Sequence, residues 1–166
     1  MKFIPHRSSL FKLTANLVSV AGYLLLAIAV GSPMFNHLAV FACLLLFVFE
    51  KKSYMVQMQA MQTAFVAMFI ELIRSVGIFA ISWGWQMFGW QESTIYTMMN
   101  VVIYGLILVQ ALVAVIGSVN AVKWKVIMIP GISKLSAWIL SHSTSVKKED
   151  YLDNSGKDGV SIKKKM

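Results

Sequence analysis

Two charged side chains, Glu71 and Arg74, lie in an otherwise uncharged apolar run from Ala64 to Trp83. A charge at the centre of a bilayer costs about 2.5–3.5 kcal/mol, so it is retained where another group compensates for it. In a helix the two side chains are one turn apart, and Glu before Arg is the favourable order for an ion pair. Such a pair can fasten a helix bundle, line a polar path for an ion, a proton or a peptide, or contact a partner subunit.

A third polar side chain, Gln110, lies near the centre of another apolar run, Asn100–Val119. Side-chain amides form hydrogen bonds between membrane helices, so we expect Gln110 to meet Glu71 and Arg74 across a helix interface. The ten Leu, Ile, Phe and Val residues of the Ala64–Trp83 run favour insertion by about 0.3–0.6 kcal/mol each. The two charges roughly cancel this gain, so we expect this helix to face the interior of a bundle.

Sequence motifs for catalysis and cofactor binding are absent. The chain has no phosphate-binding loop, dinucleotide glycine motif, nucleophile elbow or pair of catalytic carboxylates. Its histidines, His6, His37 and His142, have no Cys, Asp or Glu at metal-ligand spacing. The single cysteine, Cys43, has no activating base near it in sequence and is expected to fill space in an apolar run. The sequence therefore predicts no catalytic residue, no cofactor and no metal, and a membrane enzyme with scattered polar residues is the less favoured alternative.

Composition indicates a protein whose solvent is lipid. The chain has 166 residues, of which 58% are hydrophobic, and a mean hydropathy of +0.70, whereas a soluble domain is roughly 45–50% apolar. We expect an all-α, polytopic membrane protein with four transmembrane helices, since four apolar runs meet or approach the length of about 17–25 residues needed for a crossing. These runs are Leu13–Val30, Met34–Phe49, Ala64–Trp83 and Asn100–Val119. The break at Gly31–Pro33 predicts a helical hairpin, and a signal peptide cleaved near Ala29 is the alternative for the first run.

The distribution of lysines and arginines predicts the topology. Basic residues precede the first run and follow the second and fourth, whereas the other two connections contain none. By the positive-inside rule, both termini are expected on the cytoplasmic side of a bacterial inner membrane, or on the equivalent side of an organelle membrane. Trp83, Trp85 and Trp90 stand where the third run should leave the far side, as in an aromatic belt.

The chain after the fourth run is more polar. Apolar residues at helical spacing, Ile132, Leu135, Trp138 and Ile139, predict a short interfacial helix on the cytoplasmic leaflet, and a loop packed on the bundle is the alternative. Beyond it, a lysine-rich tail is expected to be disordered and attracted to anionic headgroups. The expected organisation is a basic N-terminal segment at 1–12, a four-helix transmembrane domain at 13–121, a cytoplasmic interfacial segment at 122–141 and a disordered charged tail at 142–166.

Two segments contain short motifs. Lys51–Ala64 reads KKSYMVQMQAMQTA and Ala121–Trp138 reads AVKWKVIMIPGISKLSAW. Both resemble segments of the small, largely uncharacterised four-helix bacterial membrane proteins that include MamF-like proteins, a group distantly similar to the Tic-type component of the chloroplast inner-envelope protein translocon. Gln57 and Gln59 stand where that family has Arg and His. The other motif positions are Ala60, Gln62, Lys123, Trp124, Lys125, Pro130 and Gly131. The resemblance implies a four-helix membrane domain with cytoplasmic termini and a role within a membrane assembly, including protein translocation.

The first hypothesis for function is a non-enzymatic integral membrane subunit or accessory scaffold factor of a membrane protein assembly, organised by Glu71, Arg74 and Gln110. The second is a component of a protein- or ion-translocation pathway that uses the same cluster as a polar path. Expected partners are a bilayer with anionic headgroups, and other membrane subunits or further copies of the chain. The net charge of +8 follows from the positive-inside bias, so nucleic acid is not an expected partner.

Overall fold

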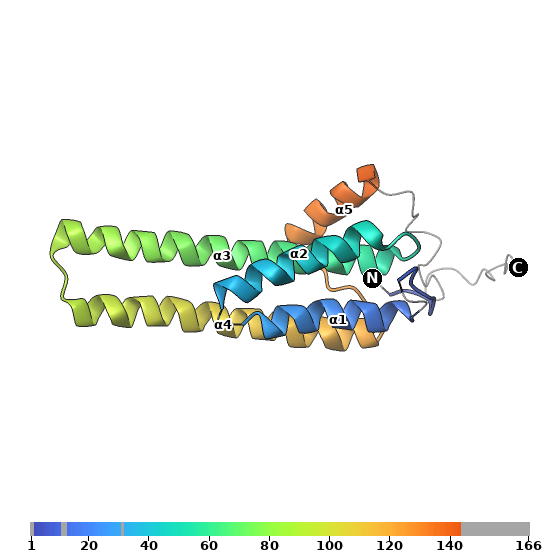
Figure 1. The fold of residues 1–166 in the computed structure, drawn as a ribbon, viewed down its shortest axis with the longest axis horizontal. Coiled ribbons are helices and arrows are strands. Elements are labelled where there is room, and N and C mark those ends of the chain that lie inside the picture. Colours follow the sequence, from blue (N-terminus) through green and yellow to red (C-terminus); the bar gives the residue numbers. More distant parts are fainter. Residues whose placement is uncertain (1, 11–12, 31, 144–166) are drawn as a thin grey trace, which may run out of the picture.

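The computed structural model describes residues 2–10, 13–30 and 32–143, which fold as helices joined by short connections (Figure 1). The elements are α1 (Ala15–Ile28), α2 (Pro33–Phe49), α3 (Tyr54–Phe88), α4 (Glu92–Val122) and α5 (Ile132–Ser143). The expected all-α class is therefore confirmed for this part of the chain, where β-structure is limited to isolated bridges at Lys2–Lys125 and Arg7–Thr14.

Helices α3 and α4 form a long hairpin that sets the length of the molecule (Figure 1). With 35 and 31 residues they extend about 53 and 47 Å, and both are long and apolar enough to cross a membrane. Helix α3 begins after Ser53, whose hydroxyl accepts a hydrogen bond from the backbone amide of Val56. It ends before Gly89, which adopts the left-handed conformation (φ 62°) that favours glycine and turns the chain toward α4.

Helices α1 and α2 form a shorter hairpin that lies along one half of α3 and α4 (Figure 1). They have 14 and 17 residues and extend about 21 and 26 Å. Pro33 occupies the first turn of α2, where a missing backbone amide costs no helical hydrogen bond. The predicted helical hairpin is present, but both helices are shorter than the roughly 20 residues of a full crossing. Of the four expected spans, α3 and α4 have the necessary length.

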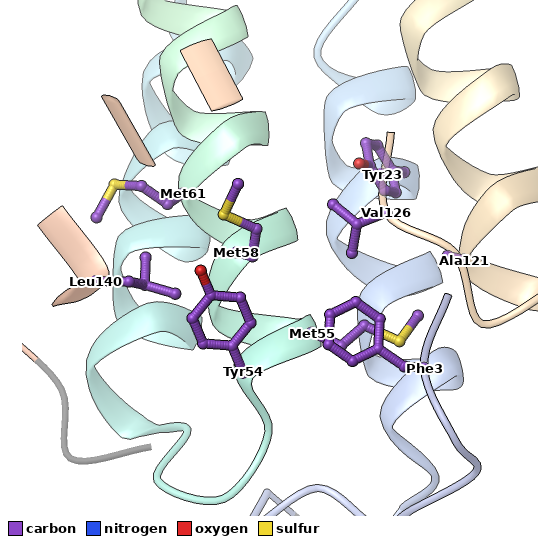
Figure 2. Packing of buried hydrophobic residues seen from close by; sticks show 9 residues of the cluster. All are labelled: Phe3, Tyr23, Tyr54, Met55, Met58, Met61, Ala121, Val126 and Leu140. Carbon is purple, nitrogen blue, oxygen red and sulfur yellow. The ribbon is translucent and has the colours of Figure 1, made fainter. Parts of the chain in front are cut away.

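The hydrophobic core is concentrated at the end of the bundle where α1 and α3 begin. Figure 2 shows a cluster there that joins the N-terminal segment, α1, α3, α4 and α5, with buried residues Phe3, Tyr23, Tyr54, Met55, Met58, Met61, Ala121, Val126 and Leu140. The backbone amide of Phe3 donates to the carbonyl of Trp124 at 2.8 Å, so the N-terminal segment is packed into this core. This end of the bundle is called the base below, and the opposite end, at the turn between α3 and α4, is called the tip.

Helix α5 packs against α3 near the base and diverges from the bundle axis (Figure 1). Its small side chains Ser133 and Ser136 are buried, whereas Leu135 and Trp138 are exposed. An outward apolar face of this kind suits contact with lipid. The expected tail starts within this helix, since α5 continues to Ser143, and the remainder of the tail lies outside the described residues.

Candidate functional site

Glu71 and Arg74 form an ion pair on α3, with 3.4 Å between Oε2 of Glu71 and Nη1 of Arg74. The Arg74 side chain is 6% exposed and the Glu71 side chain is 21% exposed. Asn36 of α2 joins the pair, because its Nδ2 donates to the carbonyl of Ala67 at 3.0 Å and lies 3.4 Å from Oε2 of Glu71. One buried amide therefore ties the charged pair to the neighbouring helix.

Gln110 of α4 is fully buried in the same region. Its Nε2 donates to the carbonyl of Leu26 in α1 at 3.0 Å and to Oδ1 of Asn36 at 3.4 Å. Gln110 therefore meets the charged pair through Asn36, which sequence reasoning did not single out. The available signal was that Asn36 is the one amide in the apolar run Met34–Phe49. We call Asn36, Glu71, Arg74 and Gln110 the polar cluster.

Asn36, Arg74 and Gln110 of the polar cluster are buried, but the cluster is not fully paired. Within the described ranges, Nε and Nη2 of Arg74 and Oε1 of Gln110 have no hydrogen-bond partner. A buried polar group without a partner costs about 1–3 kcal/mol, and more if it is charged. Water or another polar group that reached Arg74 would therefore stabilise the cluster.

A groove of about 800 Å³ lies between α2 and α3 and includes part of the polar cluster in its lining. Its polar lining comes from Asn36, His37, Glu71 and Ser75. The remaining lining is apolar and consists of Val40, Phe41, Leu44, Phe65, Ala67, Met68, Phe69, Leu72 and Leu135. A mostly apolar groove suits an acyl chain or an apolar side chain better than a column of water.

The two motif segments meet at the base. Nε2 of Gln59 donates to the carbonyl of Lys125 at 2.9 Å. Nε2 of Gln62 donates to the carbonyl of Ile127 at 3.1 Å and to Oγ of Ser133 at 2.8 Å. These hydrogen bonds fix the connection between α4 and α5, whose backbone carbonyls need partners outside a helix. The segments that carry the family resemblance therefore form one structural unit.

The other motif positions shape the chain around this unit. Trp124 has a positive φ of 56°, which is uncommon for a residue other than glycine and redirects the chain after α4. Gly131 has a φ of 78° and, together with Pro130, precedes α5. Lys123 caps the C-terminus of α4 and is exposed, whereas Ala60 is buried within α3. The role of these positions in the fold is therefore structural.

Glu50, between α2 and α3, is a fully buried carboxylate at the base. The hydroxyls of Ser8 and Ser9 donate to it, the latter at 2.8 Å. The backbone amides of Lys52 and Ser53 donate to it at 2.9 and 3.0 Å. Burial raises the pKa of this carboxyl, but hydrogen bonds from Ser8, Ser9 and Lys52 outweigh burial and hold the pKa below its usual value. This network ties the N-terminal segment to the turn between α2 and α3.

Gln57 and His6 extend the same network. Nε2 of Gln57 donates to the backbone carbonyl of Glu50 at 2.6 Å. Nε2 of His6 lies 2.7 Å from Oγ of Ser53, and Nδ1 of His6 lies 2.8 Å from the carbonyl of Ile4. A serine beside a histidine is the arrangement of a nucleophile and its general base. Here Ser53 is fully buried and its hydroxyl caps α3, so this contact holds the base together.

Sequence reasoning missed the Glu50 network because its members are far apart in the chain. Glu50 is 42 residues from Ser8 and 41 from Ser9. No local spacing relates them, and Glu50 was visible only as a lone acid at the end of an apolar run.

The described side chains offer hydrogen bonding between helices and an ion pair within α3. In the part of the chain that the structure describes, no group of three or more His, Cys, Asp or Glu residues is arranged to hold a metal ion. No family model, curated protein or solved structure matches the chain. The geometry of the base and of the polar cluster is therefore the basis for any functional proposal.

Proposed function

We propose that the protein is a non-enzymatic integral membrane subunit or scaffold factor, and that its polar cluster fastens its helices together. One observation carries this proposal: the amides of the cluster bond to backbone carbonyls of neighbouring helices. Asn36 donates to Ala67 of α3, and Gln110 donates to Leu26 of α1. Groups used in this way hold a bundle in register and are not free to act on a substrate.

The proposed location is a bacterial inner membrane, or an equivalent organelle membrane, with the base on the cytoplasmic side. Exposed lysines at the base, including Lys52 and Lys123, and exposed tryptophans toward the tip, Trp83 and Trp85, support this orientation. Both termini then lie on the cytoplasmic side, where anionic headgroups attract the lysines. This role accounts for the net charge of +8 without a nucleic-acid partner.

Helices α1 and α2 are proposed to enter the bilayer beside α3 and α4 and to complete a four-helix membrane domain. Their outward faces support this, because Leu24 of α1 and Phe41 of α2 are 53% and 60% exposed. Helix α5 is proposed to lie at the cytoplasmic interface, with Leu135 and Trp138 against lipid.

Other membrane subunits, or further copies of this chain, are the proposed protein partners. Toward the tip, α3 and α4 expose large apolar side chains such as Phe79, Val101 and Tyr104. Such a surface suits lipid or another apolar helix. The resemblance of the motif segments to MamF-like and Tic-type proteins also favours a role within an assembly.

A component of a protein- or ion-translocation pathway is the second candidate. It is favoured by the nitrogens of Arg74 that lack a partner among the described residues, and by the position of Glu71 on the groove. A conduction path needs water beside Glu71, whereas the groove lining is mostly apolar. The scaffold proposal is therefore preferred.

The test replaces both charged residues, as Glu71→Leu with Arg74→Leu. We expect lower thermal stability in mild detergent and loss of the proteins that co-purify with the wild-type chain. The reason is that, without the two charges, this face of α3 is no longer held in the interior of the helix bundle. The matched control replaces two exposed residues of the same helix that lie outside the groove, as Ile73→Ala with Val76→Ala, and should retain both properties.

Two outcomes separate the candidates. If the charge-free variant assembles normally while flux through reconstituted vesicles is lost, the scaffold role is rejected in favour of translocation. If flux in that variant equals that of the wild type, the translocation role is rejected.

A further inference from the structure

The length of α3 matches the thickness of a bilayer. Gln59 lies at the level of Lys125, to whose carbonyl it donates, and Trp85 lies toward the tip. The 26 residue steps from Gln59 to Trp85 extend about 39 Å along the helix. A bilayer measures about 40–45 Å with its headgroups. Lysines at one level and tryptophans at the other therefore fit the two headgroup regions.

The polar cluster lies half way along this distance. Glu71 is about 18 Å from the Gln59 level and about 21 Å from the Trp85 level, at 1.5 Å per residue. In the proposed orientation the cluster therefore lies near the midplane of the bilayer.

The turn between α1 and α2 lies at the same depth as the polar cluster. Asn36, in the first turn of α2, bonds to Ala67 and lies close to Glu71. Leu26, in the last turn of α1, bonds to Gln110. In Figure 1 the connection from α1 to α2 accordingly stops well short of the tip.

Several described backbone carbonyls of this turn accept hydrogen bonds from protein groups. The last carbonyls of a helix lack helical partners, and the centre of a bilayer has no water to supply them. The carbonyl of Leu26 accepts from Gln110 at 3.0 Å, and the carbonyls of Ala27 and Ala29 accept from the amides of Val30 and Ser32 at 3.3 and 3.4 Å. A turn with these partners is suited to a site without water.

A full crossing by α1 and α2 would place the polar cluster at the far headgroups. The tip half of α3 and α4 would then project into water, although Phe79 is 70% exposed and Val101 is 68% exposed. Leaving one large apolar side chain in water forgoes about 1.5–3 kcal/mol. Several such side chains make this arrangement unfavourable.

We infer that the α1–α2 hairpin enters the bilayer from the cytoplasmic side, turns at the midplane and returns to the same side. The protein is then wedge-shaped, and its wide end lies in the cytoplasmic leaflet. This inference rests on the proposed membrane location. The cytoplasmic leaflet then holds α1, α2 and half of α3 and α4, whereas the far leaflet holds α3 and α4 alone. The two additional helices occupy roughly 200 Å² at a helix diameter of 10–12 Å. Such a wedge favours membrane that is convex on its cytoplasmic side.

Sided cysteine labelling tests the depth of the hairpin, with Cys43→Ala as the background. Ser32→Cys probes the α1–α2 turn, Lys51→Cys the α2–α3 turn and Gln91→Cys the tip. With a membrane-impermeant maleimide we expect labelling of Lys51→Cys from the cytoplasmic side only and of Gln91→Cys from the far side only. Ser32→Cys should react only after the membrane is dissolved in detergent.

Labelling of Ser32→Cys from either side of an intact membrane overturns the inference. A failure of the proposed membrane location has a different signature, because Lys51→Cys and Gln91→Cys would then both react from the same side. The two failures are therefore distinguishable.

Vesicle sorting tests the wedge. The full chain is reconstituted into phosphatidylcholine vesicles that contain phosphatidylglycerol, prepared as a mixture of small and large diameters. Molecules with Lys51 outward should be enriched per unit area in the small vesicles, and molecules with Lys51 inward should be depleted there. The second orientation is an internal control, since the same protein then meets the opposite curvature. Equal density in both size classes overturns the wedge.

Discussion

Glu50 and Glu71 are carboxylates in buried surroundings, and different neighbours balance their charges. Glu50 accepts hydrogen bonds from serine hydroxyls and backbone amides at the base. Glu71 lies 3.4 Å from the guanidinium of Arg74 at the middle of α3. The carboxylate of Glu50 holds the N-terminal segment in place. The carboxylate of Glu71 balances the charge of Arg74, so that the centre of a long apolar helix has no net charge. Glu50 lies outside the long apolar stretches and is expected to respond to bulk pH.

Acid should weaken the base through Glu50. Folding lowers the pKa of Glu50 from its usual value of 4.5, so the unfolded chain binds the proton more tightly. The stabilisation is complete above about pH 4.5 and is lost as the pH falls through the folded pKa. We expect the Tm of the wild type in detergent to fall more steeply below pH 4.5 than that of Glu50→Gln, which lacks this contribution at every pH.

The exposed carboxylate Glu92 supplies the control for this measurement. Glu92→Gln should follow the wild-type pH profile, because this exposed side chain takes no part in the hydrogen bonds that hold the base together. Parallel profiles for the wild type and Glu50→Gln would show that the hydrogen bonds to Glu50 do not stabilise the fold.

Proximity along one helix decides which of these polar contacts the sequence could predict. Glu71 and Arg74 are three residues apart, so helix geometry alone places them on one face. Asn36 is 31 residues from Ala67, and Gln110 is 84 residues from Leu26. Those contacts depend on which helices become neighbours and on how they are offset, and neither follows from local spacing.

At the scale of whole helices, α1 and α4 approach closely where α4 has small side chains. Ala114, Gly117 and Ala121 are buried along one face of α4. The ring of Tyr23 from α1 lies over Gly117, where an added Cβ would come within 2.3 Å of it. Small side chains four residues apart allow another helix to approach closely, and here the approaching helix is α1.

Alanine at Gly117 should therefore separate α1 from α4. Overpacking of this kind costs about 1–3 kcal/mol, which exceeds the roughly 0.5–1 kcal/mol that alanine gains over glycine in a helix. We expect Gly117→Ala to lower the Tm. Gly105→Ala on the same helix has nothing within 4 Å of its added Cβ and should keep or raise the Tm. An equal response of the two variants would contradict the close approach.

Attachment of α5 depends on Gln62. Replacing it as Gln62→Met removes hydrogen bonds to Ile127 and Ser133, and leaves a backbone carbonyl without its partner. The expected loss is about 1–3 kcal/mol in the unfolding free energy. Limited proteolysis should then cut between α4 and α5 faster than in the wild type, while the exposed control Gln86→Met should be cut at the wild-type rate. Unchanged cleavage of Gln62→Met would show that other contacts hold α5.

Helix ends were harder to predict than helices. The apolar run Ala64–Trp83 predicted the centre of α3, yet α3 spans Tyr54–Phe88. Its first ten residues include three glutamines, so hydropathy did not mark them as part of a membrane helix. The helix continues there because Ser53 caps it, and because Gln59 and Gln62 find partners in the connection between α4 and α5 while Gln57 donates to the carbonyl of Glu50. Tertiary hydrogen bonds thus set the start of α3, which hydropathy did not indicate.

The molecule as a whole divides into a packed base and a two-helix tip. Residues of the N-terminal segment, of α1, α3, α4 and α5, and of the connection before α5 meet in the core of the base. Within 75–109, which the structure describes without a gap, Gly84 and Ile95 are the only buried residues. The base is therefore stabilised by its own packing. In the proposed membrane location, the tip relies on lipid to cover its apolar side chains and to keep water from its backbone.

Hydrogen exchange should reveal this division when the solvent of the tip is changed. In a bilayer, the backbone amides of both halves of α3 should be protected, since neither half meets water. In a short-chain detergent that admits water, amides at 76–88 should exchange many-fold faster, because only α4 packs beside them, while amides at 55–70 should keep their protection. Because both segments belong to the same helix, differences in helix length do not affect the comparison. Equal acceleration in both halves would mean that the base, too, depends on lipid and that its core contributes little stability of its own.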